Sequence, residues 1–184
     1  VTVVKAADTG NYTLISTHDF TTGTETGTEF DATTAKAAFA RNMTGTDSIN
    51  SITSVAKVYD GNGQGGAKAG KAGLIKFGTG DKNGSITIKF NTGVLVSKVV
   101  INCHSFYASS TKYPTNTENF IGVNDIAPVA APYNTTATPE NVEFVIENGS
   151  NEVTIKSNNP KNTSKGGRVV VYSISFYSSK AKKD

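Results

Sequence analysis

The sequence predicts an all-β protein, an antiparallel β-sandwich or jelly roll with one short helix near residues 32–42. Composition is the first indication, because the chain of 184 residues has 17 Val and 12 Ile but 3 Leu. β-branched side chains lose rotamer freedom in helices and pack well on strands. The second indication is a series of short segments that alternate apolar and polar residues, separated by turns rich in Gly, Asn, Ser and Thr. Together they disfavour a helical bundle.

Each expected element follows from its local pattern. Asp31 is a good N-cap for the one convincing helix, which places Ala35, Ala38 and Phe39 on one face. About eight to ten short strands are expected from alternation and turn signals. They cover residues 11–16, 18–20, 51–59, 74–78, 85–90, 94–106, 119–123, 142–146, 152–157 and 168–177.

Pairing of neighbouring strands gives three further expectations. Residues 85–90 and 94–106 read as a strand pair around the turn at 91–93, and residues 142–146 and 152–157 read as a hairpin. Residues 94–106 carry apolar side chains on both faces at their start, which predicts a central strand. The last strand is expected to place Val170, Tyr172, Ile174 and Phe176 on one face.

The length favours a single domain over residues 1–179, followed by a basic tail at 180–184. No run of eighteen apolar residues occurs, so membrane insertion is not expected. The single cysteine, Cys103, lies in an apolar run and is expected to be a buried small side chain. A chain so poor in cysteine and so rich in Thr, Ser and Asn suits a bacterial secreted protein, and we expect an extracellular or cell-surface location.

Charge argues against a nucleic-acid partner. The net charge is +3, and 16 of the 18 basic residues are lysines spread along the chain. Readers of phosphates and bases rely on arginine, and the sequence has two, Arg41 and Arg168.

Two glycine motifs between residues 61 and 73 look like nucleotide-binding loops. Gly61, Gly63 and Gly66 have dinucleotide-loop spacing, and Gly65, Gly70 and Lys71 have P-loop spacing. Both motifs need a following helix, whereas the segment that follows reads as a strand.

Metal and cofactor expectations are few. Asp60 begins a calcium-loop pattern, but Gln64 departs from it and Lys71 stands where a bidentate glutamate is needed. A calcium site of EF-hand type is therefore excluded. Asp60 or Asp19, with backbone carbonyls, remains a candidate for a structural calcium ion, and no cofactor is required.

Catalysis is not expected. The chain lacks the G-x-S-x-G and H-E-x-x-H motifs. A pair of carboxylates for glycoside hydrolysis stays open, because any two of the 15 acidic residues could meet in the fold. A glycan-active hydrolase is therefore a third hypothesis, behind two non-catalytic ones.

A binding site for sugars is the best-supported interpretation of the polar and aromatic residues that follow the long strand. We expect Tyr107, Tyr113 or Tyr133 to stack on sugar rings, and His104, Lys112, Asn116 and Asn119 to bind hydroxyl groups. The candidate ligand-binding residues are His104, Phe106, Tyr107, Lys112, Tyr113, Asn116, Asn119 and Tyr133. The plainer alternative is that Phe106 and Tyr113 cover the sandwich edge. The absence of Trp excludes a multi-tryptophan platform for crystalline polysaccharide.

Several motifs from Val58 to Phe176 carry a family resemblance. They are VYDGNG, GLIKFGTGDKNGSITIKF, VSKVVINCHSFY, NFIGVN, VEFVIENGSNEVTIKS and GGRVVVYSISFY. In this order they resemble secreted bacterial β-sandwich accessory modules of gut Firmicutes, similar to carbohydrate-binding modules of the starch-adherence type. The resemblance implies a jelly roll and an extracellular setting, and it assigns no binding residue.

We therefore expect a non-catalytic carbohydrate-binding module that attaches a larger secreted or cell-surface protein to a polysaccharide. The first candidate ligand is an α-glucan such as starch, bound along a chain or at a chain end. Its partners would be a polysaccharide or oligosaccharide and the other modules of that protein. The alternative is a structural or adhesive surface domain with no glycan ligand.

Overall fold

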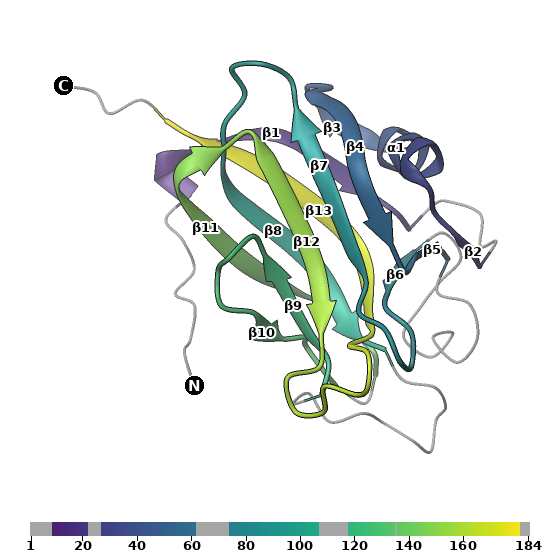
Figure 1. Cartoon of the computed structure of the whole chain (residues 1–184). Coiled ribbons are helices and arrows are strands. Elements are labelled where there is room, and N and C mark those ends of the chain that lie inside the picture. Colours follow the sequence, from purple (N-terminus) through teal and green to yellow (C-terminus); the bar gives the residue numbers. More distant parts are fainter. Residues whose placement is uncertain (1–8, 22–26, 62–73, 107–117, 135, 181–184) are drawn as a thin grey trace.

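Two antiparallel β-sheets pack face to face in the computed structural model, which describes residues 9–21, 27–61, 74–106, 118–134 and 136–180. In Figure 1, β7, β12 and β9 lie in front of β8, β13 and β11. The prediction of an all-β sandwich with a short helix is confirmed. The predicted tail falls almost wholly outside the described residues.

The larger sheet has eight strands among the described residues and is built around β13 (Val169–Ser179). On one side β13 pairs with β8 along most of its length. Its other side is divided, because Val169–Val171 pair with β6 whereas Tyr177 and its neighbours pair with β1. The other strands of this sheet are β1 (Tyr12–Asp19), β2 (Thr28–Glu29), β3 (Met43–Gly45), β5 (Val58–Asp60), β6 (Ile75–Phe77), β8 (Val96–Ser105) and β11 (Glu140–Ser150).

The smaller sheet has five strands in the order β10, β9, β12, β7 and β4. They are β4 (Ile49–Ala56), β7 (Ser85–Phe90), β9 (Phe120–Val123), β10 (Val129–Ala130) and β12 (Glu152–Asn158). β10 lies inside residues 124–141, a segment rich in proline, and pairs with β9 through two residues.

Both predicted hairpins are wrong, because the paired segments lie in different sheets. The chain passes between the sheets from β7 to β8 and again from β11 to β12. The two corners are joined by Asn151, whose side-chain Nδ2 donates to the carbonyl oxygens of Phe90 at 3.1 Å, Asn91 at 3.0 Å and Val94 at 3.0 Å. Alternation shows which side of a strand is buried but does not show which strand is its partner.

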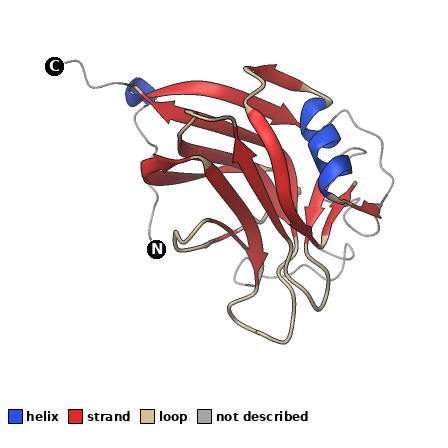
Figure 2. Ribbon diagram, turned by 45° about the horizontal axis from the view of Figure 1, so that its top comes forward, coloured by secondary structure: helices blue, strands red, loops and turns tan. Residues whose placement is uncertain are grey.

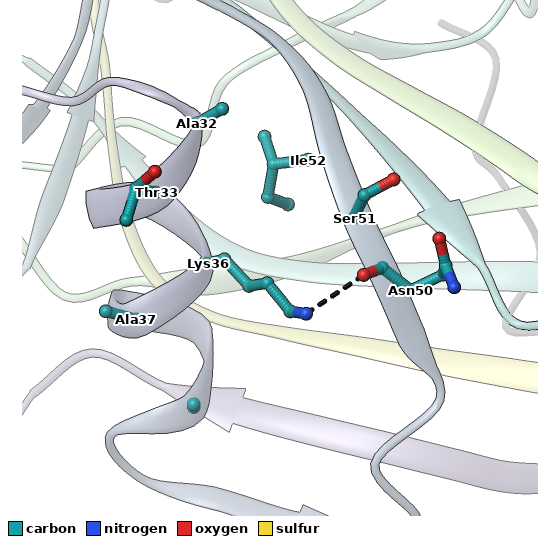
Figure 3. A pocket seen from close by; sticks show the side chains of 8 residues that line it. Ala32, Thr33, Lys36, Ala37, Asn50, Ser51 and Ile52 are labelled. Atoms are coloured by element: carbon teal, nitrogen blue, oxygen red, sulfur yellow. Dashed lines mark hydrogen bonds between the residues drawn. The ribbon is translucent and has the colours of Figure 1, made fainter.

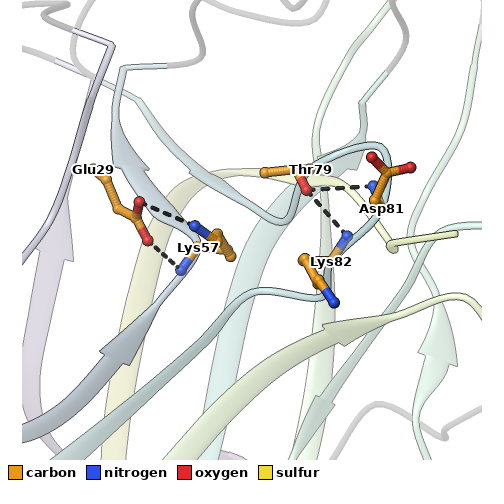
Figure 4. Close-up of polar contacts among 5 residues, drawn as sticks. All are labelled: Glu29, Lys57, Thr79, Asp81 and Lys82. Carbon is orange, nitrogen blue, oxygen red and sulfur yellow. Dashed lines mark hydrogen bonds and ion pairs between the residues drawn. The ribbon is translucent and has the colours of Figure 1, made fainter.

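A third passage between the sheets divides the predicted strand at 51–59 into β4 and β5. It occurs at Lys57, whose φ of 52° is in the left-handed region. Glu29 holds this corner, accepting from the Lys57 backbone N–H at 2.9 Å and lying 3.4 Å from its Nζ (Figure 4). The next turn, before β7, is held by the Thr79 hydroxyl, which accepts from the backbone N–H groups of Asp81 and Lys82 (Figure 4).

The last strand, β13, contains a β-bulge that the sequence does not predict. Val171 lies opposite Cys103 and Ser173 lies opposite Asn102, so Tyr172 is an extra residue in the strand. Val169, Val171, Ile174 and Phe176 belong to the main core, whereas Val170 and Tyr172 belong to a separate cluster. The prediction that Val170 and Tyr172 share a face with Ile174 and Phe176 is therefore wrong, because the bulge shifts the alternation by one residue.

The predicted helix is α1 (Ala32–Ala40), which lies beside β4 at one side of the sandwich (Figure 2). Asp31 and Thr34 form a reciprocal capping box at its start. Phe39 packs at 5.0 Å from the ring of His18 and 5.2 Å from that of Phe20. The His18 Nδ1 atom lies 2.7 Å from the Phe39 carbonyl oxygen, and Nε2 lies 2.9 Å from the Ser16 hydroxyl. Because a carbonyl only accepts, Nδ1 carries the proton.

The core lies between the two sheets and is closed at one side by α1. Cys103 of β8 is fully buried in it, as the sequence predicts, together with Val99 and Ile101 of the same strand. Burial raises the pKa of the Cys103 thiol far above its usual value. The Phe176 ring lies 5.0 Å from that of Phe90 in the facing sheet and 5.6 Å from His18.

Replacing the fully buried side chain in Phe176→Ala should lower the free energy of unfolding by about 3–5 kcal/mol, because a large ring is lost from a packed core. Leu95→Ala, at a side chain that is 50 % exposed, should change it by less than about 0.5 kcal/mol. Guanidinium denaturation of both variants measures the difference. Equal losses would contradict this description of the core.

His18 should make the protein less stable in mild acid. Burial lowers the pKa of His18 below its ordinary value of 6.5, so the folded state favours the neutral ring. Its contribution to stability is complete above pH 6.5 and is lost as the pH falls from there through the folded-state pKa. Denaturation curves between pH 7.5 and 5.5 should show a smaller pH dependence for His18→Asn than for the wild type. The same pH dependence in both would contradict this role.

Candidate functional site

A second apolar cluster lies on the outer face of the eight-stranded sheet, opposite the main core. It contains Leu74, Phe106, Ala137, Val170 and Tyr172. The strand register places a row of side chains across this face. Tyr59 lies opposite Lys76, Lys76 opposite Val170, and Val170 opposite His104. Each side chain comes from a different strand, so only the folded sheet brings the row together.

Two cations, Lys76 and Arg168, lie against aromatic rings on this face of the sheet. Lys76 Nζ lies 4.8 Å from the ring centre of Tyr59 and 5.2 Å from that of Phe106. The guanidinium carbon of Arg168 lies 4.6 Å from the same Phe106 ring. These distances are within the range of cation–π attraction. We call Tyr59, Lys76, Phe106, Tyr133 and Arg168 the outer-face patch.

Burial works against the charged state of both cations in the patch. Burial lowers the pKa of Lys76, and the positive charge of Arg168 lowers it further. Burial also lowers the pKa of Arg168, an effect that the carboxylate of Asp81 opposes. Asp81 itself lies 3.7 Å from the Nζ of Lys165 and is well exposed.

His104 is fully buried on this face of the sheet and holds the backbone next to the patch. Its Nδ1 lies 2.8 Å from the carbonyl oxygen of Ser105, and the backbone N–H of Asn134 donates to Nε2 at 3.0 Å. These partners require a proton on Nδ1 and a lone pair on Nε2, which is the neutral ring. Burial also lowers the pKa of His104. Both ring nitrogens are therefore hydrogen-bonded to the backbone. The His104 ring centre lies 6.0 Å from that of Tyr133, a half-buried residue.

Asn119 is also part of this support. Its side chain is 4 % exposed and joins three segments. The Nδ2 atom donates to the Ser105 hydroxyl at 2.9 Å and the Phe106 carbonyl at 3.2 Å, and Oδ1 accepts from the Arg168 backbone N–H at 2.8 Å. The amide therefore fixes the two residues, Phe106 and Arg168, that carry the cation–π contact.

Of the predicted ligand-binding residues, His104, Phe106, Asn119 and Tyr133 come together at one end of this sheet. Tyr107, Lys112, Tyr113 and Asn116 lie outside the described residues. Sequence reasoning missed the other three members of the patch, Tyr59, Lys76 and Arg168. Lys76 had a local signal, since it stands between two buried residues in its strand, but its neighbours depend on strand order.

The two aspartates proposed for calcium already have protein partners. The Asp60 carboxylate accepts hydrogen bonds from both terminal nitrogens of the Arg41 guanidinium, at 3.0 and 3.1 Å. Asp19 accepts the backbone N–H of Thr21 at 2.8 Å and its hydroxyl at 2.6 Å. Within the described ranges, no group of three or more His, Cys, Asp or Glu side chains is arranged to hold a metal ion. A structural calcium ion at either aspartate stays a prediction.

A groove of about 430 Å³ runs between α1 and the edge strand β4 (Figure 3). Lys36 reaches across it and donates to the backbone carbonyl of Asn50 at 2.9 Å. Alanine side chains at positions 32, 37 and 40 form much of its wall. It has no aromatic side chain among the residues that line it, so it is a weaker site for a sugar than the outer-face patch.

Comparison of the chain with protein-family models, with curated proteins and with solved structures gives no match. The resemblance to secreted accessory modules therefore stays a prediction. Across the part of the chain that the structure describes, no helix has the length and apolar character needed to cross a membrane.

Asn119→Ala should lower the free energy of unfolding by about 1–3 kcal/mol, because it leaves the Ser105 hydroxyl, the Phe106 carbonyl and the Arg168 N–H without their partner. Asn141→Ala is the matched control. It removes an exposed amide whose side-chain contact is with Asn102 at 2.9 Å, and it should cost less than about 0.5 kcal/mol. Urea denaturation measures both. Wild-type stability of Asn119→Ala would show that this amide does not hold the site together.

Proposed function

We propose that this protein is a non-catalytic carbohydrate-binding module whose ligand lies across the outer-face patch. The observation that supports the proposal most strongly is that two half-buried tyrosines and two half-buried cations lie together on the outer face of the larger sheet, around the ring of Phe106. Neighbouring strands lie about 4.8 Å apart, so the row from Tyr59 to His104 spans roughly 14 Å. Val170 and His104 are buried in this row, but Tyr59 stands at one end and the Tyr133 ring centre lies 6.0 Å from that of His104 at the other. The distance between the two tyrosines suits a short stretch of an oligosaccharide.

The residue types match the two sides of a sugar ring. Tyrosine has an apolar face for the C–H side of a pyranose and a hydroxyl that bonds to polar groups. Tyr59 and Tyr133 are both half-buried, so each ring is supported by the protein and still reaches solvent. Lys76 and Arg168 between them supply donors for ring hydroxyls. Binding sites combine such apolar surfaces with a few placed polar groups.

The setting we propose is a module of a larger secreted or cell-surface protein. The α-glucan predicted from the sequence is one of the polysaccharides to be tested. A structural or adhesive domain predicts that no glycan binds, and a glycan-active hydrolase predicts that products are released from a bound glycan. Affinity electrophoresis against soluble polysaccharides, with product analysis of the same samples, separates these three functions.

Tyr59→Ala and Tyr133→Ala should each weaken binding of the retained polysaccharide about tenfold, because each removes a stacking surface. Tyr177→Ala is the matched control. Tyr177 is also half-buried and lies against a lysine, with Lys98 Nζ 4.4 Å from its ring centre, but it is seven residues away along β13 from Val170. Calorimetric titration should show wild-type affinity for this control. If all three tyrosine variants bind like the wild type, the ligand does not lie on the patch.

A further inference from the structure

Two half-buried positive charges share one aromatic ring at the centre of the outer-face patch. Lys76 Nζ and the Arg168 guanidinium carbon lie 5.2 and 4.6 Å from the Phe106 ring centre. Phe106 is 4 % exposed, so its ring is held in place by the protein while both charges lie against it. The backbone sets the geometry, because the Phe106 N–H donates to the Arg168 carbonyl oxygen at 3.1 Å.

The described residues provide no acidic partner in contact with these charges. The ion pairs found in the described part of the chain join Arg41 to Asp60, Lys57 to Glu29, and Lys165 to Asp81. Lys76 and Arg168 take part in none of them. Asp81 acts on Arg168 through its charge, and its carboxylate is the one paired with Lys165.

This arrangement is costly without an anion. Partly buried cations lose hydration, and like charges near one another disfavour the charged state of both. Lysine and arginine in proteins usually offset such a loss with a carboxylate. Here the direction of the pKa shift on Lys76 reflects both burial and the neighbouring guanidinium. An anion placed between the two groups would relieve both effects.

We infer that the ligand is an acidic glycan and that the carboxylate of a uronic acid residue binds between Lys76 and Arg168. This inference rests on the proposed function and changes its ligand class from a neutral to an acidic polysaccharide. The guanidinium fork matches a planar carboxylate with two parallel hydrogen bonds, and the ammonium group adds a third donor. Tyr59 and Tyr133 then contact the flanking sugar rings.

A carboxylate on a sugar suits the patch better than the phosphates of a nucleic acid. A nucleic-acid backbone requires a track of several cations, and its affinity is dominated by such contacts. The patch offers only one pair of cations, Lys76 and Arg168. Tyr59 lies beside Lys76, and Tyr133 lies beside His104 at the other end of the row. The chain has a net charge of +3 spread over its length.

The test compares polygalacturonate, soluble starch and single-stranded DNA in calorimetric titrations with the full chain. We expect polygalacturonate to bind more tightly than starch, and its affinity to fall as NaCl is raised from 20 to 300 mM, roughly the range over which salt screens such pairs. Lys76→Gln and Arg168→Gln should each weaken polygalacturonate binding about tenfold or more. Lys76→Arg keeps the charge and should retain most of the affinity.

Lys89→Gln is the matched control, because Lys89 is an exposed lysine on β7 of the other sheet and should leave binding unchanged. Thermal unfolding of each variant distinguishes lost binding from lost folding. Lys76→Gln should change the melting temperature little, because the loss of its cation–π contacts is offset by the removal of one of two like charges. A large drop for Lys76→Gln would overturn the claim that this charge lacks a partner.

The remaining outcomes separate this inference from the function on which it rests. Starch binding that equals or exceeds polygalacturonate binding, unaffected by Lys76→Gln, would overturn the acidic ligand and leave the carbohydrate-binding function in place. Binding of DNA in preference to both glycans would overturn both. If polygalacturonate and starch fail to bind while free galacturonate binds and depends on Arg168, the anion site stands and the polysaccharide-binding function fails.

Discussion

The bulge at Tyr172 is the constraint on which the two faces of the larger sheet depend. One extra residue in β13 lets Val169, Val171, Ile174 and Phe176 all reach the core, although they do not follow a single alternation. The same residue leaves Val170 and Tyr172 on the outer side, where they underlie the second cluster. Bulges commonly re-aim side chains in this way. A regular strand would turn either Phe176 or Val171 away from the core.

The bulge also marks the division of the strand between two neighbours. Before it, β13 pairs with β6, which carries Lys76, and after it, β13 pairs with β1. The Phe20 backbone N–H donates to the Tyr172 carbonyl at 2.9 Å, so the end of β1 is fixed at the bulge itself. The outer-face patch therefore occupies the half of the sheet that β5 and β6 extend. Changing the register of β13 would separate Lys76 from Phe106 and Arg168.

The sequence predicted what depends on local pattern and missed what depends on strand order. Alternation located β7 and β8 and the buried sides of both, and Asp31 located the start of α1. Alternation did not show that β7 and β8 belong to different sheets. The corner between them is held by the side-chain amide of Asn151, which is 57 residues beyond Val94 in the sequence, so no local pattern reveals it. The sequence also did not show that His104, predicted as a ligand contact from its closeness to Tyr107, is fully buried with both ring nitrogens bonded to backbone. Lys76 and Tyr59 share a row with His104 only because four strands pair in this order.

The outer face of the larger sheet has a lysine among aromatic rings at each end, Lys98 at one and Lys76 at the other, and the two differ in what surrounds their charge. Lys98 is 1 % exposed and lies between two rings, with Nζ 4.7 Å from the centre of Tyr12 and 4.4 Å from that of Tyr177. Aromatic faces on both sides can replace part of the hydration that the ammonium group loses. Lys76 has rings beside it too, but Arg168 brings a second positive charge to the same Phe106 ring. The first arrangement is complete as a structural contact of β8 with β1 and β13, whereas the second is completed by an anion.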